Sequence, residues 1–441
     1  MRVERIEWDG RDAAGIARVL RDDRPDPEEV SGVVAEIVHE VAERGDGAVR
    51  ELTRRLDGVE LGPGPARVDP ATIRRAADDV PADVRAAMEL AAANVRRVAE
   101  AELAATFPVD VALAEGQRVQ LVDSPVGAAG VYVPGGGAAY PSSVLMCCIP
   151  ARAAGVGRVA VATPPGADGR VHPSVLAACA VAGIGELYAI GGAQAIAALA
   201  LGTESVPAVD LIAGPGNRYV IEAKRLLSAR VGIDGIAGPT ELVVVADASA
   251  DPEWVALDVC AQAEHGTDGL LVVIGPDGEL LERTAELLGE LALTRSSVPE
   301  SLVSIVTAPA IEAALALADA IAPEHVELQL DGADEETARA RVAGCVFVGA
   351  FGAAAFGDYA AGSSHVLPTG GAARFGRPLG ARTFMRRTSI VSIPPSAAAA
   401  LAPATAALAR AEGFPVHGES ARSPRARSRA WPSAIPTSSV V

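Results

Sequence analysis

The sequence has few of the residues on which several classes of protein depend. Lysine occurs only once, at Lys224, so arginine supplies nearly all of the positive charge. Five cysteines occur without any CxxC pair. An odd number of cysteines in apolar surroundings argues against a disulfide framework and against a thiolate zinc site. We therefore expect buried, chemically inert thiols at Cys147, Cys148, Cys179, Cys260 and Cys345.

Long apolar runs and excess positive charge are also missing. Half of the residues are hydrophobic, yet no stretch of about 18 residues is free of charges or Gly/Pro breaks, so no membrane span is expected. The first residues, MRVERIEWDGRD, lack the apolar core of a signal peptide, and a cytoplasmic protein is the expectation. The net charge of −18 would repel phosphate backbones, which argues against a nucleic-acid partner.

The spacing of apolar residues changes along the chain. In the first 110 or so residues they recur at three- and four-residue intervals, which predicts helices, and Asp69–Pro70 and Pro81 stand where helices would begin. From about residue 118, short β-branched runs alternate with Ala-rich helical segments, which predicts parallel α/β units in two blocks. The runs predicted to be buried strands are 119–122, 130–133, 158–162, 187–190, 211–212, 242–245, 270–273 and 345–348.

Gly-Pro joints at 134–137 and 238–239 predict the edges of an inserted domain. The expected fold class is α/β: two Rossmann-like, incomplete parallel-sheet domains, one inserted in the other, with small helical or tail segments at both ends. The predicted parts are an N-terminal segment, 1–27; a larger α/β domain with the metal and catalytic residues, 28–131 plus 241–380; an inserted nucleotide-binding domain, 132–240; and a C-terminal segment, 381–441, which would reach a partner subunit. Residues 421–441 of the last segment are rich in Arg, Ser and Pro and are expected to be disordered.

Four of the six histidines lie beside acids, amides or Gly-rich turns. Gln262 and His265 are one turn apart near the predicted end of a helix. An amide oxygen and an imidazole nitrogen can share a divalent metal, although a solvated helix end would show the same pattern. His417 follows a helix that ends at Gly413 and would supply a second imidazole.

Two further segments combine acids with histidines. Glu324 and His325 follow Pro323, which breaks a helix and fixes a turn, so the pair can act as base and acid if both side chains enter one pocket. A polar surface turn is the alternative. The Gly/Ser-rich loop from Asp358 to His365 can bring backbone close to a ligand, or it is an ordinary flexible loop. An acid, an amide and two imidazoles would make a zinc shell, although no local spacing brings together Asp358, Gln262, His265 and His417.

The usual dinucleotide fingerprint, GxGxxG after a strand, is absent. Glycine turns follow strand-like runs at 130–137, 190–196 and 213–217 instead. Each could expose backbone N–H groups to a phosphate or could be a tight βα turn. Three of them in one block predict a ligand groove at the strand ends.

The segments GVYVPGG, YPSSVLM, IGGAQAIAALA, AGPGN, GPTE, QAEHG, APEHVE and GDYAAGSSHVLPTGG occur in an order that resembles the histidinol dehydrogenase family, from about residue 28 to about 417. The resemblance implies a cytoplasmic homodimer with shared active sites that acts in histidine biosynthesis. Such an enzyme oxidises L-histidinol to L-histidine through the aldehyde, with two NAD used in succession and one zinc ion per subunit.

The resemblance also implies roles for individual residues. Glu324 would activate the water that hydrates the aldehyde, and His325 would transfer protons and contact the substrate. Zinc and substrate would be held by Gln262, His265, Asp358 and His417, the last supplied by the partner subunit. NAD would lie against Tyr132, Gln194 and Asn217, and the substrate would also lie near Thr240, His365 and Glu412.

Two features depart from the family pattern. Thr240 replaces the usual Ser but keeps the hydroxyl, and an Arg/Ser/Pro-rich tail after His417 replaces a short ending with a compact apolar stretch. A badly packed tail would misplace His417 and weaken zinc binding. Two other functions remain open from the residues alone. A zinc hydrolase with Glu324 as base explains the metal ligands but not the glycine turns, and a non-enzymatic ligand-binding protein would not need Glu324.

Overall fold

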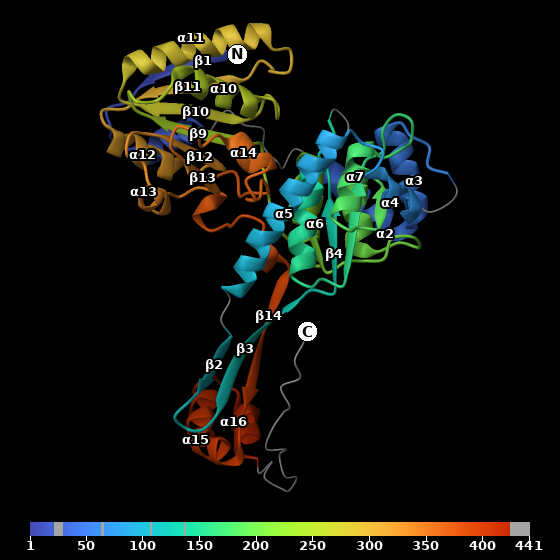
Figure 1. Cartoon of the computed structure of the whole chain (residues 1–441). Coiled ribbons are helices and arrows are strands. Elements are labelled where there is room, and N and C mark those ends of the chain that lie inside the picture. Colours follow the sequence, from blue (N-terminus) through green and yellow to red (C-terminus); the bar gives the residue numbers. More distant parts are fainter. Residues whose placement is uncertain (22–29, 63–65, 106–107, 136–137, 424–441) are drawn as a thin grey trace. The chain divides into compact units, whose positions relative to one another are not determined.

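The computed structural model describes residues 1–21, 30–62, 66–105, 108–135 and 138–423. It divides into two compact units: the first comprises Met1–Ala105 and Pro125–Met385, and the second comprises Thr106–Ser124 and Arg386–Val441. The first unit contains two parallel sheets with helices on both faces (Figure 1). The α/β fold class with two parallel-sheet domains is therefore confirmed.

The N-terminal part of the chain forms helices, as its apolar spacing predicts. Val34, Ile37 and Val41 make the buried stripe of one of these helices, and the Asp69 side chain caps another that begins at Pro70. The elements are α1 (Ala13–Val19), α2 (Ser31–Arg44), α3 (Asp46–Leu52), the π-helical turn η2 (Thr53–Asp57), α4 (Pro70–Ala76) and α5 (Ala82–Ala104).

A five-stranded parallel sheet has the order β6-β5-β4-β7-β8. Its strands are short, buried runs of Ala, Val and Ile, as expected for a sheet covered on both faces. Its strands are β4 (Ala128–Tyr132), β5 (Arg158–Thr163), β6 (Leu187–Ala189), β7 (Leu211–Ala213) and β8 (Gly232–Ile233). The helices within this stretch are α6 (Pro141–Ala153), α7 (Pro173–Val181), α8 (Gly192–Leu201) and α9 (Arg218–Leu227).

The packing of α2 to α5 corrects the predicted domain boundaries. One face of the five-stranded sheet packs against α5, α6 and α7, and the other against α2, α3, α8 and α9. The prediction joins residues 28–131 to 241–380, but the helices between 31 and 104 cover the sheet of the supposed insertion. Helical periodicity identifies the buried face of a helix but not the sheet that buries it, which explains the error.

A six-stranded parallel sheet has the order β1-β11-β10-β9-β12-β13. Helices α10 and α11 cover one face, and α1 and α12 cover the other. The strands are β1 (Arg2–Glu7), β9 (Glu241–Ala246), β10 (Leu270–Gly275), β11 (Leu302–Thr307), β12 (His325–Gln329) and β13 (Cys345–Val348). The helices are α10 (Pro252–Ala263), α11 (Gly278–Thr294), α12 (Ile311–Ile321), α13 (Glu335–Arg339) and α14 (Ala354–Tyr359), followed by the short turns η3 (Ala372–Arg374) and η4 (Ala381–Phe384).

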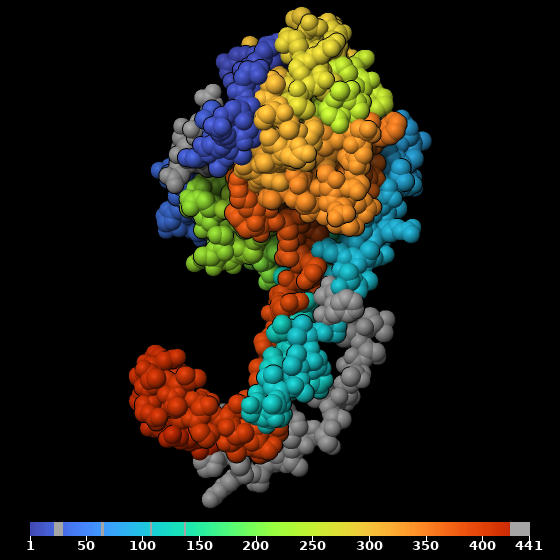
Figure 2. All heavy atoms as spheres, turned by 90° about the vertical axis from the view of Figure 1, so that its left-hand side faces the viewer, coloured from blue at the N-terminus to red at the C-terminus, as the bar shows by residue number. Residues whose placement is uncertain are grey.

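The N-terminus belongs to this sheet and is not the separate segment, 1–27, that was predicted. Strand β1 pairs with β11 along its whole length, from Arg2 beside Leu302 to Glu7 beside Thr307. In Figure 2 the blue N-terminal segment accordingly lies against the yellow and orange surface of the six-stranded domain. Residues 22–27 of the predicted segment lie outside the described residues.

The second unit is small. It contains most of a three-stranded sheet of order β14-β3-β2, in which β2 and β3 are antiparallel, together with two helices. The elements are β2 (Val109–Ala112), β3 (Arg118–Pro125), β14 (Met385–Ser392), α15 (Pro395–Ala411) and α16 (Pro415–Arg422). Residues 108–124 thus belong to the second unit and not to the larger domain to which they were assigned.

The predicted disordered tail, 421–441, overlaps the structure only at its start. Ala421 and Arg422 end helix α16, and residues 424–441 lie outside the described part of the chain. Within the described residues, no helix combines the length and the apolar character that a membrane crossing requires.

Candidate active site

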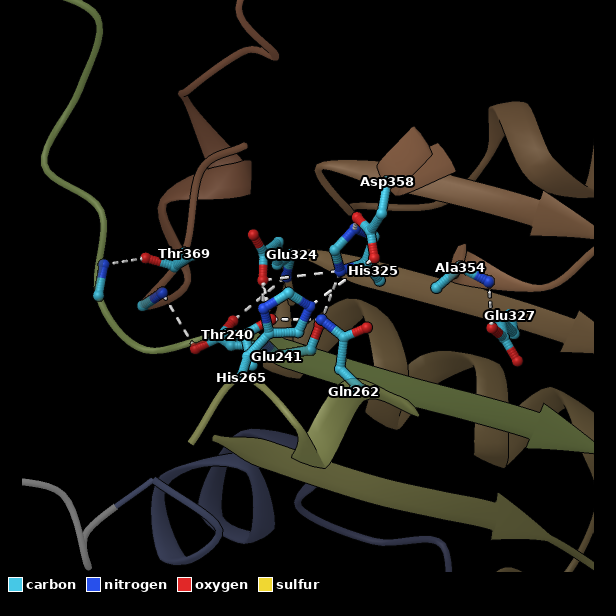
Figure 3. A network of polar contacts seen from close by, with 12 residues as sticks. Thr240, Glu241, Gln262, His265, Glu324, His325, Glu327, Ala354, Asp358 and Thr369 are labelled. Carbon is cyan, nitrogen blue, oxygen red and sulfur yellow. Dashed lines mark hydrogen bonds and ion pairs between the residues drawn. The ribbon is translucent and has the colours of Figure 1, made fainter. Parts of the chain in front are cut away.

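The candidate site lies at the amino-terminal ends of β9 and β12, which are neighbours in the six-stranded sheet. Helix α12 ends at Ala322, which takes the left-handed conformation (φ 51°) that is uncommon for a residue with a Cβ. Pro323 follows, and His325 is the first residue of β12. Figure 3 shows the polar side chains converging here from β9, α10, β12 and α14.

Glu324 is held by groups at the start of β9. Its Oε2 accepts a hydrogen bond of 2.7 Å from the Thr240 hydroxyl and one of 2.9 Å from the backbone N–H of Glu241. Burial raises the pKa of Glu324, although the charge of His325 and these hydrogen bonds oppose the rise. A buried carboxyl whose pKa lies above its usual range is suited to act as a base.

The geometry places a proton on the Nδ1 atom of His325. Its Nδ1 lies 3.2 Å from the backbone oxygen of Glu241, which can only accept, so Nδ1 carries the proton. Its Nε2 faces Asp358, whose Oδ1 is 3.8 Å away. Phe347 of β13 stacks on the ring with its centroid 5.9 Å from the ring centre. His325 is therefore oriented from two sides and presents its Nε2 to the site.

Three of the four predicted metal ligands lie in the first unit. The His265 Nε2 and Asp358 Oδ2 atoms face each other, 3.9 Å apart. Gln262 donates its amide N–H to the Thr240 hydroxyl, so its amide oxygen stays available to a metal. An acid, an imidazole and an amide oxygen suit zinc. Across the described residues no three His, Cys, Asp or Glu side chains gather as a metal cluster, and an amide ligand falls outside that set.

The remaining predicted ligand and one substrate residue belong to the second unit. His417 lies in α16 and stacks on Phe414, with ring centroids 5.5 Å apart. Glu412 caps the end of α15 and is exposed.

His365, predicted to lie near the substrate, is tied to its surroundings through both ring nitrogens. Its Nδ1 donates to the backbone oxygen of Asp358 at 3.1 Å, and its Nε2 accepts from the Ser143 hydroxyl at 2.9 Å. Burial lowers the pKa of His365, which favours this neutral form. The side chain therefore holds the Asp358 backbone in place.

The predicted NAD residues lie at the carboxyl ends of three strands of the five-stranded sheet, β4, β6 and β7. Tyr132 ends β4, Gln194 lies in the first turn of α8 after β6, and Asn217 caps α9 after β7. Ligands of open parallel sheets bind at this edge. The Tyr132 hydroxyl accepts from the backbone N–H of Gly192 at 3.0 Å, and the Asn217 side chain accepts from the N–H groups of Tyr219 and Val220. Gly136 and Gly137 of the first predicted turn lie outside the described residues.

Sequence reasoning missed three charged groups that support these sites. Asp57, at the end of η2, accepts from the Gln194 amide at 3.1 Å. Glu241 accepts from the backbone N–H of Glu324 at 3.2 Å and pairs with Arg21 at 2.6 Å. Only Glu241 could have been found from the sequence, because it directly follows Thr240 in the GPTE motif. Asp57 and Arg21 are distant in the sequence from the residues that they contact.

The loop Ala213–Asn217 is anchored by the only lysine. Lys224 Nζ donates to the backbone oxygen of Gly214 at 2.9 Å and forms a buried ion pair with Asp234. Asp234 in turn accepts from the N–H of Gly214 at 2.7 Å. The ion pair thus fixes both polar groups of one glycine in the predicted nucleotide turn.

The Thr240 hydroxyl is predicted to keep Glu324 ionised. In the variant Thr240→Val, Glu324 loses a hydrogen bond that lowers its pKa, so the acid limb of the activity profile should move to higher pH. Activity should fall about 10-fold, since one hydrogen bond to a charged group is worth about 1.5 kcal/mol. Thr240→Ser, which keeps the hydroxyl, is the matched control. Identical pH profiles for the Val and Ser variants would contradict this role.

Together the fold and the site define an α/β enzyme with a buried Glu–His pair beside three potential metal ligands. The sequence profile of the histidinol dehydrogenase family matches residues 20–425. The chain therefore belongs to the histidinol dehydrogenase family, a family of oxidoreductases in histidine biosynthesis.

Individual relatives agree with the family profile. Histidinol dehydrogenase from Ruegeria pomeroyi is 45% identical over 407 residues, which cover 90% of this chain and 92% of the relative. That from Zymomonas mobilis is 41% identical over 424 residues, covering 94% and 98%. The crystal structure of histidinol dehydrogenase from Elizabethkingia anophelis matches with a TM-score of 0.86 at 29% identity and covers 96% of this chain and 97% of that one. The family resemblance is confirmed, and the hydrolase alternative finds no support in these comparisons.

Proposed function

We propose that the chain catalyses the NAD-dependent oxidation of L-histidinol through L-histidinaldehyde to L-histidine, the last step of histidine biosynthesis. The observation that carries the proposal is the convergence of Glu324, His325, His265 and Asp358 in one cluster. A bound zinc ion would fix the substrate, and NAD would accept a hydride in each of the two oxidations. One zinc ion per subunit is proposed, held by Gln262, His265, Asp358 and, from a partner subunit, His417.

His325 is proposed to move the protons. Because Nδ1–H is held by the Glu241 carbonyl, Nε2 is the atom that can take the proton from the substrate hydroxyl as the first hydride leaves. An imidazole changes protonation near neutral pH and so suits repeated proton transfer.

Glu324 is proposed to take a proton from the water that adds to the aldehyde. Its carboxyl is buried next to His325, with 3.6 Å between Glu324 Oε2 and His325 Nδ1. Addition of that water gives the hydrate, the second hydride leaves the same carbon, and the product is a carboxylate. Glu324 and His325 thus have separate roles, and neither is proposed as a metal ligand.

NAD is proposed to bind along the carboxyl edge of the five-stranded sheet, against Tyr132, Gln194 and Asn217. The support is that the glycine-containing turns after β6 and β7 both lie beside Tyr132, where helices α8 and α9 begin. Thr240, His365 and Glu412 are proposed to lie near the substrate.

A homodimer is proposed as the functional state, with His417 and Glu412 supplied across the subunit boundary. The second unit exposes large apolar side chains on its own helices and strands, which is typical of a surface that is covered in an assembly. These exposed residues include Val109, Val111, Leu408, Phe414 and Val416. The cytoplasmic location stays a prediction.

The test is to follow NADH absorbance when the zinc-loaded protein is mixed with L-histidinol and NAD. We expect two NADH for each histidine formed, loss of the signal after chelation of the metal, and recovery when zinc is added back. Absence of NADH formation by the zinc-loaded protein would refute the proposal. Sedimentation of the same sample tests the dimer separately.

A further inference from the structure

A second buried carboxylate follows the candidate catalytic pair on the same strand. Side chains on a strand alternate between faces, so His325, Glu327 and Gln329 of β12 point to one side of the sheet. Glu327 is completely buried. No role in proton transfer falls to it, yet an acid is rarely buried without a specific partner.

One oxygen of Glu327 binds the start of helix α14. Its Oε1 accepts a buried hydrogen bond of 2.7 Å from the backbone N–H of Ala354, the first residue of that helix (Figure 3). Asp358 lies four residues later, one turn along the same helix. The carboxylate of Glu327 therefore connects strand β12 to the helix that presents a proposed metal ligand.

The other oxygen, Oε2, is buried and receives no well-aligned hydrogen bond from the described residues, although the amide of Gln329 lies near enough to lower the pKa of Glu327. The carboxyl of Asp258, on helix α10, lies within hydrogen-bonding reach of Glu327, and burial raises the pKa of both groups. A buried and a half-buried carboxylate at this range repel each other unless they share a proton. A shared proton would remove this repulsion, because a protonated carboxyl can donate to an ionised one.

Asp258 extends the connection to a third element. Gln262 lies one turn after Asp258 on α10, and His265 follows directly after that helix. The Asp258–Glu327 pair thus contacts each element that carries the site: α10 with Gln262 and His265, β12 with His325, and α14 with Asp358.

We infer that Glu327 and Asp258 are positioning residues that hold α10 and α14 at the spacing needed for Gln262, His265 and Asp358 to bind one metal ion. The inference rests on the proposed zinc site. Groups that orient metal ligands in this way typically change metal affinity by about 10- to 100-fold when they are removed.

The experiment uses amide and apolar variants of both residues in the full chain. In Glu327→Gln the amide can accept from Ala354 and donate to Asp258, and in Asp258→Asn it can donate to Glu327, so both links survive. Glu327→Met and Asp258→Ala remove them. The dissociation constant for zinc is measured by competition with a chromogenic chelator, and thermal unfolding reports on folding. Thr284→Val on α11, which removes a buried hydroxyl bound to the Leu280 carbonyl at 2.9 Å, controls for loss of stability alone.

We expect zinc affinity within about 3-fold of the unaltered protein for Gln, Asn and Thr284→Val, and about 10- to 100-fold weaker binding for Met and Ala. Folded Met and Ala variants that bind zinc as tightly as the unaltered protein would overturn the inference while leaving the proposed zinc site intact. If Glu327→Met fails to fold, Asp258→Ala decides, because Asp258 is only half-buried. Failure of the unaltered chain to bind zinc would overturn both proposals.

Discussion

Replacing Glu324 with Gln is expected to lower the rate of histidine formation by about 10²- to 10⁴-fold, the usual contribution of a positioned general base. The amide oxygen of Gln can still accept from the Thr240 hydroxyl and the Glu241 N–H, so the side chain should keep its place. It cannot take a proton from water. The aldehyde should therefore form, because His325 is unchanged, and its oxidation should stall.

The stability of the Glu324→Gln variant should not fall at neutral pH. Burial raises the folded-state pKa of Glu324, so the folded form binds its proton more tightly than the unfolded form. Ionisation then weakens folding as the pH rises through that pKa, and a neutral amide removes this effect. The measurement is product analysis for aldehyde and histidine together with thermal unfolding, with the exposed acid variant Glu312→Gln as control. Histidine formation at the unaltered rate would rule out Glu324 as the water-activating base.

Replacing Lys224 with Met is expected to lower the free energy of unfolding of its domain by about 3–5 kcal/mol, as found when one partner of a buried ion pair is removed. The Lys224 side chain is 1% exposed and that of Asp234 is 4% exposed, so Asp234 would keep a buried charge without compensation. The Gly214 oxygen would lose its donor as well. Since Gly214 belongs to the proposed nucleotide turn, NAD affinity should also fall.

The double variant Lys224→Met/Asp234→Asn distinguishes two causes of lost stability: loss of the ion pair itself, and burial of the Asp234 charge without a partner. Asn can still accept from the Gly214 N–H, and no charge remains buried, so most of the stability should return. Urea unfolding monitored by circular dichroism measures both proteins. If Lys224→Met is as stable as the unaltered chain, the ion pair does not contribute to folding. If the single and double variants lose the same free energy of unfolding, the unpaired charge of Asp234 is not the cause of the loss.

The helices and most of the buried strands could be predicted because their patterns are local. Strand β12 was missed because His325, Glu327 and Gln329 interrupt its apolar residues with polar ones, although all five side chains are buried. Strand β1 was missed because RVERIE is rich in charge and pairs with β11, about 300 positions away. The spacing of apolar residues predicts neither a buried strand that contains polar side chains nor a strand whose partner is distant in the sequence.

The candidate site shows the same limit. Gln262 and His265 could be paired from their spacing on a helix, but only the fold brings Asp358 to His265. The family resemblance supplied that grouping in advance. It did not assign a role to Asp57, Glu241 or Asp258, which act on the site only through other residues.

The buried Lys224 gives the folded protein an unusual chemical property. It carries the only side-chain amine in the sequence, and that amine is enclosed with Asp234. Amine-directed acylating reagents should therefore react with the α-amine of the native protein but modify position 224 only when the five-stranded domain opens. The mass added at that one site would then report opening of the proposed nucleotide-binding domain without any engineered label.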